Sequence, residues 1–211
     1  MKTSPRVNAT WSLVHAERAA LVEDLAGLDE TQWGRQSLCG EWTVREVAAH
    51  LVNNARTTRL GIVREMVRAR FDFDRQNANG VARELGDSPA ETLDRLRKVV
   101  GRTDTPPAPL DSRLVEEVVH GEDIRRPLGI THSYAPEAVT RSLAYQARTS
   151  VAMGGGRQRI AGVRLVATDA DVAIGDGPEV SGPALSLLLA TSGRTVALDD
   201  LAGPGLATLR D

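Results

Sequence analysis

Residues 38–52 read LCGEWTVREVAAHLV, and this stretch indicates where a helix begins and what it carries. Thr43 and Glu46 have the spacing of a capping box, in which each side chain accepts a hydrogen bond from the other residue's backbone N–H. The apolar residues that follow recur at the spacing of a helix with one buried face, and they are Val44, Val47, Ala48, Leu51 and Val52. His50 lies inside this apolar run. We therefore predict a helix that begins at Thr43 and directs His50 into a helical bundle.

Helical periodicity continues on both sides of this stretch. Upstream, apolar residues from about Val7 to Leu28 predict an amphipathic helix, and residues 29–42 break the period and are predicted to be a loop. Downstream, the helical pattern continues or restarts to about Arg70. Start and stop signals then predict further helices at 88–100, at 112–122, where the sequence RRPLG would end the helix, and at 136–153.

The run Gly154-Gly155-Gly156 is predicted to be a flexible boundary between two domains. Beyond it the apolar period changes from helical to alternating, which indicates short strands followed by a helix. These elements are predicted at 163–167, 172–174 and 182–193, with a last short helix after Pro204. The predicted fold class is α+β, with a helical bundle over residues 1–153 and a small α/β domain over residues 157–211.

The composition is that of a globular protein with an ordinary core: 41% of residues are hydrophobic, 26% are charged, and the net charge is −2. This charge does not favour nucleic acid as a partner. No stretch approaches the ~18 consecutive apolar residues that a membrane span needs. One cysteine, Cys39, excludes an internal disulfide framework and fits a reducing compartment. We therefore expect a cytoplasmic protein with no nucleic acid and no membrane as partner.

Three residues have the types and spacing of a metal site. Glu116 and His120 are four residues apart in a predicted helix, so their side chains share one face. Because packed helices lie about 8–10 Å apart, His50 on another helix can complete the site. Two imidazoles and a carboxylate suit Zn²⁺, or less certainly Fe(II) or Ni(II), and leave a coordination position open. The alternatives are a surface Glu–His hydrogen bond and a core histidine satisfied by a neighbour, and the spacing alone leaves both open.

Asp123 follows His120 by three residues, on nearly the same helix face. Its carboxylate can orient the His120 imidazole by hydrogen-bonding the second ring nitrogen. The alternative is an ion pair with Arg125 or Arg126 at the helix end.

Asn53 and Asn54 follow His50 by three and four residues, so they can flank the metal and hydrogen-bond a sugar-bearing thiol. The alternative for each is plain exposure to solvent. A basic stretch begins nearby and is interrupted by acidic residues, which favours a solvated face. Its arginines are Arg56, Arg59, Arg64, Arg68, Arg70 and Arg75.

The stretches LCGEWTVREVAAHLV (38–52) and VVHGEDIRRPLG (118–129) resemble the mycothiol-dependent maleylpyruvate isomerase family, a branch of the DinB-like helical metalloproteins. The stretch VRLVATDADVAIGDGPEVSGPALSLLLATSGR (163–194) resembles the small, sterol-carrier-like second domain of that family. The resemblance implies a DinB-like four-helix bundle, up-down with a crossover, followed by a small α/β domain. It places the family's metal ligands on His50, Glu116 and His120.

The resemblance also implies the chemistry. An external thiol, mycothiol, binds as a thiolate at the open metal position and attacks an electrophile. In the isomerase the thiol adds to a conjugated double bond, the bond rotates and the thiol leaves, whereas relatives transfer the thiol to other electrophiles. We therefore expect a metal- and mycothiol-dependent isomerase or S-transferase from a high-GC actinobacterium, in agreement with the arginine-rich composition.

Arg194 is the residue that the resemblance suggests for holding the carboxylates of a small electrophilic substrate, because an arginine forks onto a carboxylate. The alternative to an enzyme is a non-catalytic module that uses the same bundle to bind a metal, a thiol or another ligand, since a fold does not fix a function.

Overall fold

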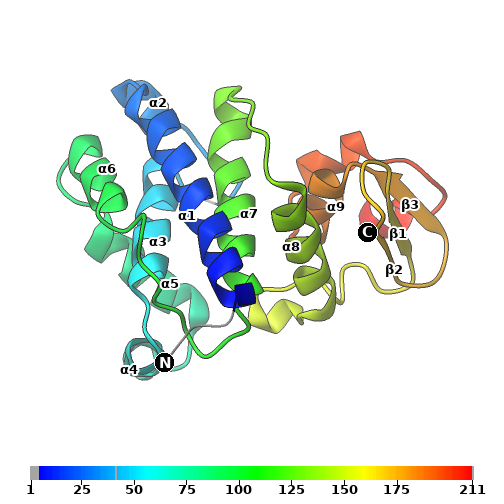
Figure 1. The fold of residues 1–211 in the computed structure, drawn as a ribbon, viewed down its shortest axis with the longest axis horizontal. Coiled ribbons are helices and arrows are strands. Elements are labelled where there is room, and N and C mark those ends of the chain that lie inside the picture. The colour runs from blue at the N-terminus through cyan, green and yellow to red at the C-terminus, as the bar shows by residue number, and fades with distance from the viewer. Residues whose placement is uncertain (1–4, 41, 211) are drawn as a thin grey trace. The chain divides into compact units, whose positions relative to one another are not determined.

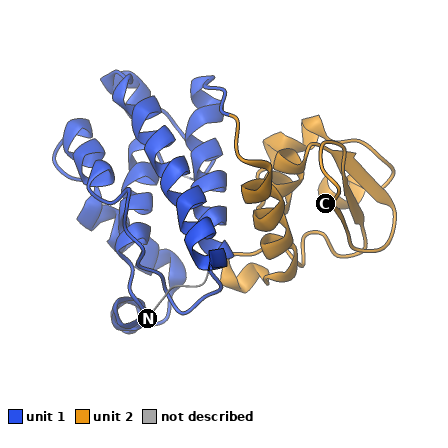
Figure 2. Ribbon diagram, viewed as in Figure 1, with its two compact units in different colours: residues 1–132 blue, residues 133–211 orange. Residues whose placement is uncertain are grey.

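The computed structural model describes residues 5–40 and 42–210. The chain divides into two compact units, residues 1–132 and residues 133–211, coloured blue and orange in Figure 2. This division comes earlier than the glycine run at which we predicted it. The reason is that helix α8 (Pro136–Arg148) packs on helix α9 (Ala184–Thr191) and so belongs to the second unit.

The glycine run itself allows close packing within unit 2. A Cβ atom on Gly155 would lie 2.1 Å from the carbonyl oxygen of Thr149, and one on Gly156 would lie 2.0 Å from that of Thr191. Only a residue without a side chain fits where two backbone segments approach so closely. The run is therefore a packing position within unit 2, and the division between the two units lies before it.

Four helices of unit 1 form a ring around its core (Figure 1). They are α1 (Pro5–Ala26), α3 (Val44–Arg56), α6 (Pro89–Arg97) and α7 (Asp111–Leu128). Helices α1 and α3 each pack against both α6 and α7. The expected helical bundle is thus present, and the whole chain has the predicted α+β fold class.

Three further helices surround this ring. Helix α5 (Phe73–Glu84) packs on α3, helix α4 (Arg59–Arg68) packs on α5, and the short helix α2 (Glu30–Trp33) adds Trp33 to the core. We had predicted residues 29–42 to be a loop, but a capping box between Asp29 and Gln32 begins α2 there. None of the described helices is long and apolar enough to cross a membrane.

Helix α3 begins as its sequence predicts. Thr43 is the N-cap, its side chain accepts from the N–H of Glu46, and its own N–H donates to Glu46 Oε2 at 2.8 Å. The apolar residues after this cap are buried in the core of unit 1. Burial of one helix face is what stabilises a helix of this length in a bundle.

Helix α7 extends further than predicted. We expected it to end near Glu122, but it continues to Leu128 and contains Pro127. A proline in the last turn removes one backbone hydrogen bond and leaves the rest of the helix intact. Gly129, at φ 71°, then ends the helix in the left-handed conformation that glycine adopts readily.

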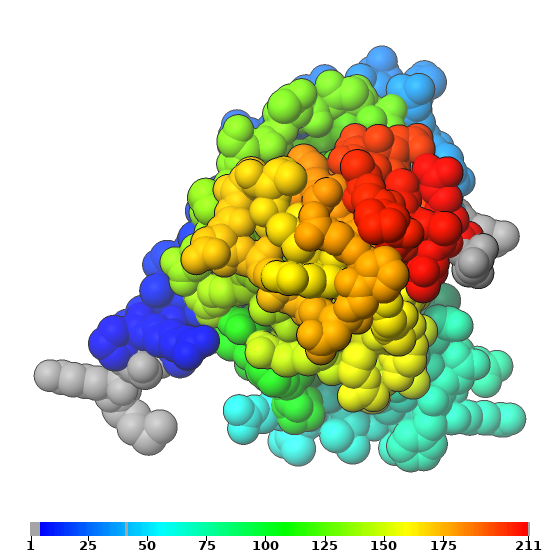
Figure 3. Space-filling view, turned by 90° about the vertical axis from the view of Figure 1, so that its right-hand side faces the viewer, coloured from blue at the N-terminus to red at the C-terminus, as the bar shows by residue number. Residues whose placement is uncertain are grey.

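Unit 2 has a three-stranded sheet in the order β2-β1-β3. Strands β1 (Arg164–Ala167) and β2 (Ala173–Ile174) are the predicted pair and run antiparallel, whereas β3 (Glu179–Gly182) was not predicted and runs parallel to β1. Helix α9 packs on β1 and β3. The space-filling view shows part of the chain that follows α9, coloured red, at the surface turned to the viewer (Figure 3).

Candidate metal centre

Helices α3 and α7 bring together the three residues that the sequence singles out. His50 Nε2 lies 3.4 Å from Glu116 Oε2, and His120 Nε2 lies 3.3 Å from the same oxygen. One ligand atom from each residue lies within 4.8 Å of the other two. The fold therefore brings the three predicted ligands together, and their role as metal ligands stays a prediction.

The His50 side chain is packed between two rings. Its ring centroid lies 5.1 Å from that of Trp42 and 4.8 Å from that of His120. Its Nδ1 atom is buried and has no hydrogen-bond partner among residues 5–40 and 42–210. This packing directs Nε2 toward Glu116. Nε2 is the nitrogen of His50 that would bind an ion shared with Glu116.

The three groups have different protonation preferences. Burial lowers the pKa of His50, although its hydrogen bond with Glu116 opposes this shift. Burial alone would raise the pKa of Glu116, but hydrogen bonds with His120 and His50 hold it well below its ordinary value. Burial alone would lower the pKa of His120, but its hydrogen bonds with Asp123, Cys39 and Glu116 raise it well above its ordinary value. Without an ion, these shifts favour a neutral His50, an ionised Glu116 and a protonated His120 near neutral pH.

Asp123 contacts His120 as one of our two alternatives predicted. Its Oδ2 lies 2.8 Å from His120 Nδ1, and the side chain is fully buried. Cys39 also lies close to His120, since Cys39, His120 and Asp123 form a second group of possible ligands. Cys39 does not form such a group with His50 and Glu116 within the described part of the chain.

Arg113 is a buried residue of the centre that our sequence analysis missed. Its guanidinium lies 3.8 Å from Glu116 Oε1 and donates to the backbone oxygen and the side-chain oxygen of Asn54. The signal for it was present, because Arg113 precedes Glu116 by three residues and so shares its helix face. Asn54 thus holds the positively charged guanidinium of Arg113 beside the carboxylate of Glu116.

Asn53 is directed to another part of unit 1. Its Oδ1 accepts from Arg83 at 2.6 Å, and its side chain packs against Gly80 on α5. Both Asn53 and Asn54 are buried, at 4% and 8% exposure, so the solvent-exposed alternative was wrong for both. A contact of either residue with a thiol stays a prediction.

Arg194 belongs to unit 2, where it precedes the short helix η2 (Thr195–Asp200). Its guanidinium donates to the backbone oxygen of Ser192 at 2.7 Å. Its predicted role toward a substrate carboxylate stays a prediction.

Comparisons with known proteins agree with this fold and identify a family. The family described as the mycothiol maleylpyruvate isomerase N-terminal domain matches residues 14–125, which are more than half of the chain and include His50, Glu116 and His120. Two solved structures, a mycothiol-dependent maleylpyruvate isomerase and a mutant of it, each have a TM-score of 0.66 and 17% sequence identity to this chain. Each alignment covers 97% of this chain and 96% of the solved one. A comparison with curated proteins found no match. The chain belongs to the mycothiol maleylpyruvate isomerase N-terminal domain family.

Proposed function

We propose that this chain is a divalent-metal- and thiol-dependent enzyme that acts on a small electrophilic substrate. The proposed thiol is mycothiol, and the proposed reaction is a maleylpyruvate isomerase-like isomerisation or the transfer of the thiol onto the electrophile. The observation that carries the proposal is that a single oxygen of Glu116 lies 3.4 Å and 3.3 Å from the Nε2 atoms of His50 and His120.

The residues at this centre fit a divalent ion. His50, Glu116 and His120 would hold it, and a set of two imidazoles and one carboxylate is typical of catalytic zinc sites that keep one position open. When bound, the ion would supply the positive charge that lowers the pKa of a thiol in the open position. The Nε2 atoms of both histidines face the same oxygen of Glu116, which agrees with this assignment.

The surrounding residues orient the ligands. Asp123 accepts the Nδ1 proton of His120, which fixes the ring and keeps Nε2 on the side of Glu116, where it would bind the ion once it has lost its proton. Arg113, held by Asn54, places a positive charge beside Glu116, which adds to the hydrogen bonds from His120 and His50 that lower the pKa of this carboxylate. The Trp42 ring packs against the His50 ring, with their centroids 5.1 Å apart.

Arg194 is the proposed partner of the substrate. A planar guanidinium binds a carboxylate through two parallel hydrogen bonds, which would orient an unsaturated acid. Replacement of Arg194 by Ala is expected to weaken substrate use and to leave metal binding unchanged.

The test measures metal content and turnover in the same preparation. We expect about one divalent ion per chain, and conversion of an unsaturated acid only when both the ion and mycothiol are present. Chelation should abolish conversion and added Zn²⁺ should restore it. The variants His50→Ala and Glu116→Gln should lose both the ion and the conversion, whereas His15→Ala, a histidine outside the centre, should lose neither.

The opposite result would favour a non-catalytic binding module. If the ion stays bound and no thiol changes the rate with any electrophile tested, the protein binds a ligand without converting it. Full metal content in a variant carrying both His50→Ala and His120→Ala would show that the ligands are other residues.

A further inference from the structure

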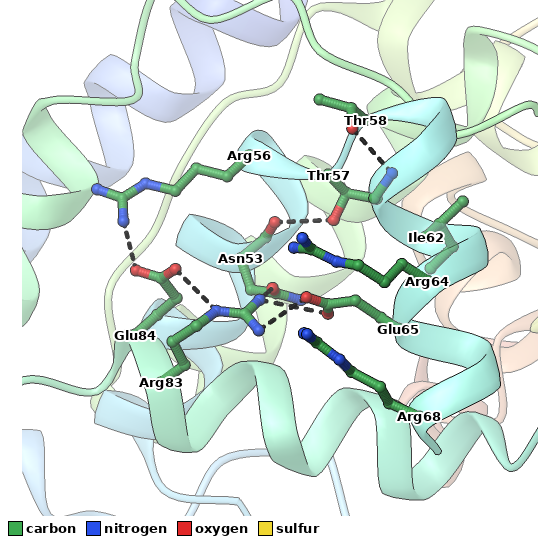
Figure 4. Close-up of a pocket in the computed structure, with 11 residues that line it drawn as sticks. Asn53, Arg56, Thr57, Thr58, Ile62, Arg64, Glu65, Arg68, Arg83 and Glu84 are labelled. Carbon is green, nitrogen blue, oxygen red and sulfur yellow. Dashed lines mark hydrogen bonds and ion pairs between the residues drawn. The ribbon is translucent and has the colours of Figure 1, made fainter. Parts of the chain in front are cut away.

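A pocket of unit 1, separate from the proposed metal centre, lies between α3, α4 and α5, and its volume is about 290 Å³ (Figure 4). None of the proposed metal ligands lines this pocket. Four arginines and two glutamates are among the residues that do, and they are Arg56, Arg64, Arg68, Arg83, Glu65 and Glu84. We had assigned the arginines of this stretch to a solvated face, but three of them line the pocket.

The ion pairs of the pocket neutralise only two of its four arginines. Arg56 pairs with Glu84 at 2.6 Å, and Arg83 pairs with Glu65 at 2.8 Å and with Glu84 at 3.4 Å. Within residues 5–40 and 42–210, the side chains of Arg64 and Arg68 form no ion pair or hydrogen bond. The pocket therefore keeps two uncompensated positive charges.

Arg64 and Arg68 are placed to act on one ligand. They are four residues apart on α4, so they share a helix face, and Figure 4 shows both side chains extending along the pocket on either side of Glu65. Both side chains are exposed, so a ligand can reach them. Two guanidinium groups at this spacing repel each other, and a bound anion would relieve that repulsion.

The opposite wall of the pocket is fixed. Arg83 donates to Asn53 Oδ1 at 2.6 Å, and Asn53 is itself buried against Gly80. Thr58 accepts from the N–H of Gly61 at 3.0 Å, which leaves the proton of its hydroxyl available to a ligand. Arg64, Arg68 and the Thr58 hydroxyl thus offer hydrogen-bond donors around one space.

We infer that this pocket binds a small dianion, either a phosphate ester or a dicarboxylate, with Arg64 and Arg68 as its principal ligands. Two negative charges match the two uncompensated guanidinium groups, and each group can form paired hydrogen bonds with a phosphate or a carboxylate. The inference goes beyond the proposed function and does not depend on it, because the pocket contains none of the proposed metal ligands.

The experiment is isothermal titration of the full-length protein with inorganic phosphate and, separately, with succinate at low ionic strength. The protein is first stripped of metal by a chelator and then desalted, because a dianion also binds an open metal position. We expect saturable binding of at least one of the two anions. The double variant Arg64→Gln/Arg68→Gln should weaken it by about tenfold or more for each arginine, because a hydrogen bond to a charged group contributes about 1.5–3 kcal/mol and 1.4 kcal/mol corresponds to tenfold.

The matched control is Arg59→Gln/Arg75→Gln, which removes the same charge from exposed positions outside the pocket. It should leave the affinity unchanged, and circular dichroism should show that both double variants are folded. The variant Arg64→Lys/Arg68→Lys keeps the charge without the paired donors, so it should bind more weakly than the natural protein and more tightly than the glutamine variant.

The choice of anion identifies the ligand class. Tighter binding of phosphate would support a phosphate ester, and tighter binding of succinate would support a dicarboxylate. Equal weakening in the control and in Arg64→Gln/Arg68→Gln, or no saturable binding of either anion, would overturn the inference. Failure of the thiol-dependent reaction would leave this titration unaffected, so the two proposals fail independently.

Discussion

The backbone N–H of Leu38 donates to the carbonyl oxygen of Asp123 at 3.1 Å. In an uninterrupted helix this oxygen would accept from the N–H of residue 127, but that residue is Pro127 and has no N–H. The proline therefore leaves an acceptor that ties the loop before α3 to the last turns of α7. Asp123 therefore contacts the loop before α3 through its backbone oxygen and His120 through its side chain.

The variant Asp123→Asn should lower metal affinity by about 10–100-fold, the usual effect of losing a group that orients a metal ligand. An asparagine keeps the shape and an acceptor oxygen but removes the negative charge that makes the His120 imidazole a better ligand. Competition with a chromophoric chelator would measure the affinity. The control is Glu122→Gln, the neighbouring carboxylate, which pairs with Arg126 at 2.8 Å. Equal affinities for the two variants would contradict the assigned role of Asp123.

Metal binding should release about one proton per chain near neutral pH, because ligands must lose their protons before they coordinate. The pKa of His120 is raised, so this ring is still protonated at pH values where an ordinary histidine is neutral, whereas the lowered pKa of His50 keeps that ring neutral. Apparent affinity should therefore rise with pH until His120 has lost its proton. Calorimetric titration with Zn²⁺ in buffers of different ionisation enthalpy counts the protons. A buffer-independent enthalpy would show that His120 is already neutral.

Cys39 should not bind the metal, although its thiol lies close to His120. It forms a group of possible ligands with His120 and Asp123, and among the described residues it forms none with His50 and Glu116. Substitution of the metal by Co²⁺ should give a spectrum without a thiolate-to-cobalt charge-transfer band. The variant Cys39→Ser should keep its metal content and any thiol-dependent activity. Such a band in the natural protein, and its loss in Cys39→Ser, would make Cys39 a ligand.

Loss of one partner of the Arg18–Glu117 ion pair should lower the free energy of unfolding more than loss of one partner of an exposed pair. Its atoms lie 2.8 Å apart, and the two side chains are 1% and 2% exposed. The variant Glu117→Leu leaves the Arg18 charge buried without its partner and should lower the free energy of unfolding by about 3–5 kcal/mol. Urea denaturation measures the loss.

A matched comparison for this pair is Asp94→Leu, which breaks an exposed ion pair with Arg97. Its effect should stay below about 1 kcal/mol because solvent screens exposed charges. The double variant Arg18→Met/Glu117→Leu should recover most of the stability, since no buried charge is left unpaired. If Glu117→Leu and Asp94→Leu have the same effect, burial does not set the contribution of the Arg18–Glu117 pair.

The sequence by itself determined the features that depend on neighbours along the chain. The start of α3 follows from the Thr43–Glu46 capping box, and the shared face of Glu116 and His120 follows from their spacing of four. The position of His50 in an apolar run was enough to direct it into the bundle. In each case residues within one or two helical turns determine the outcome.

Tertiary structure alone decided the features that join distant segments. The continuation of α7 through Pro127, the buried contact of Arg113 with Asn54, and the close approach of Gly156 to Thr191 all depend on residues far apart in the sequence. Arg56 pairs with Glu84 and Arg83 pairs with Glu65, which leaves Arg64 and Arg68 uncompensated. These pairs depend in the same way on how α3, α4 and α5 pack. No local pattern reports such contacts, because their partners become neighbours only when the core forms.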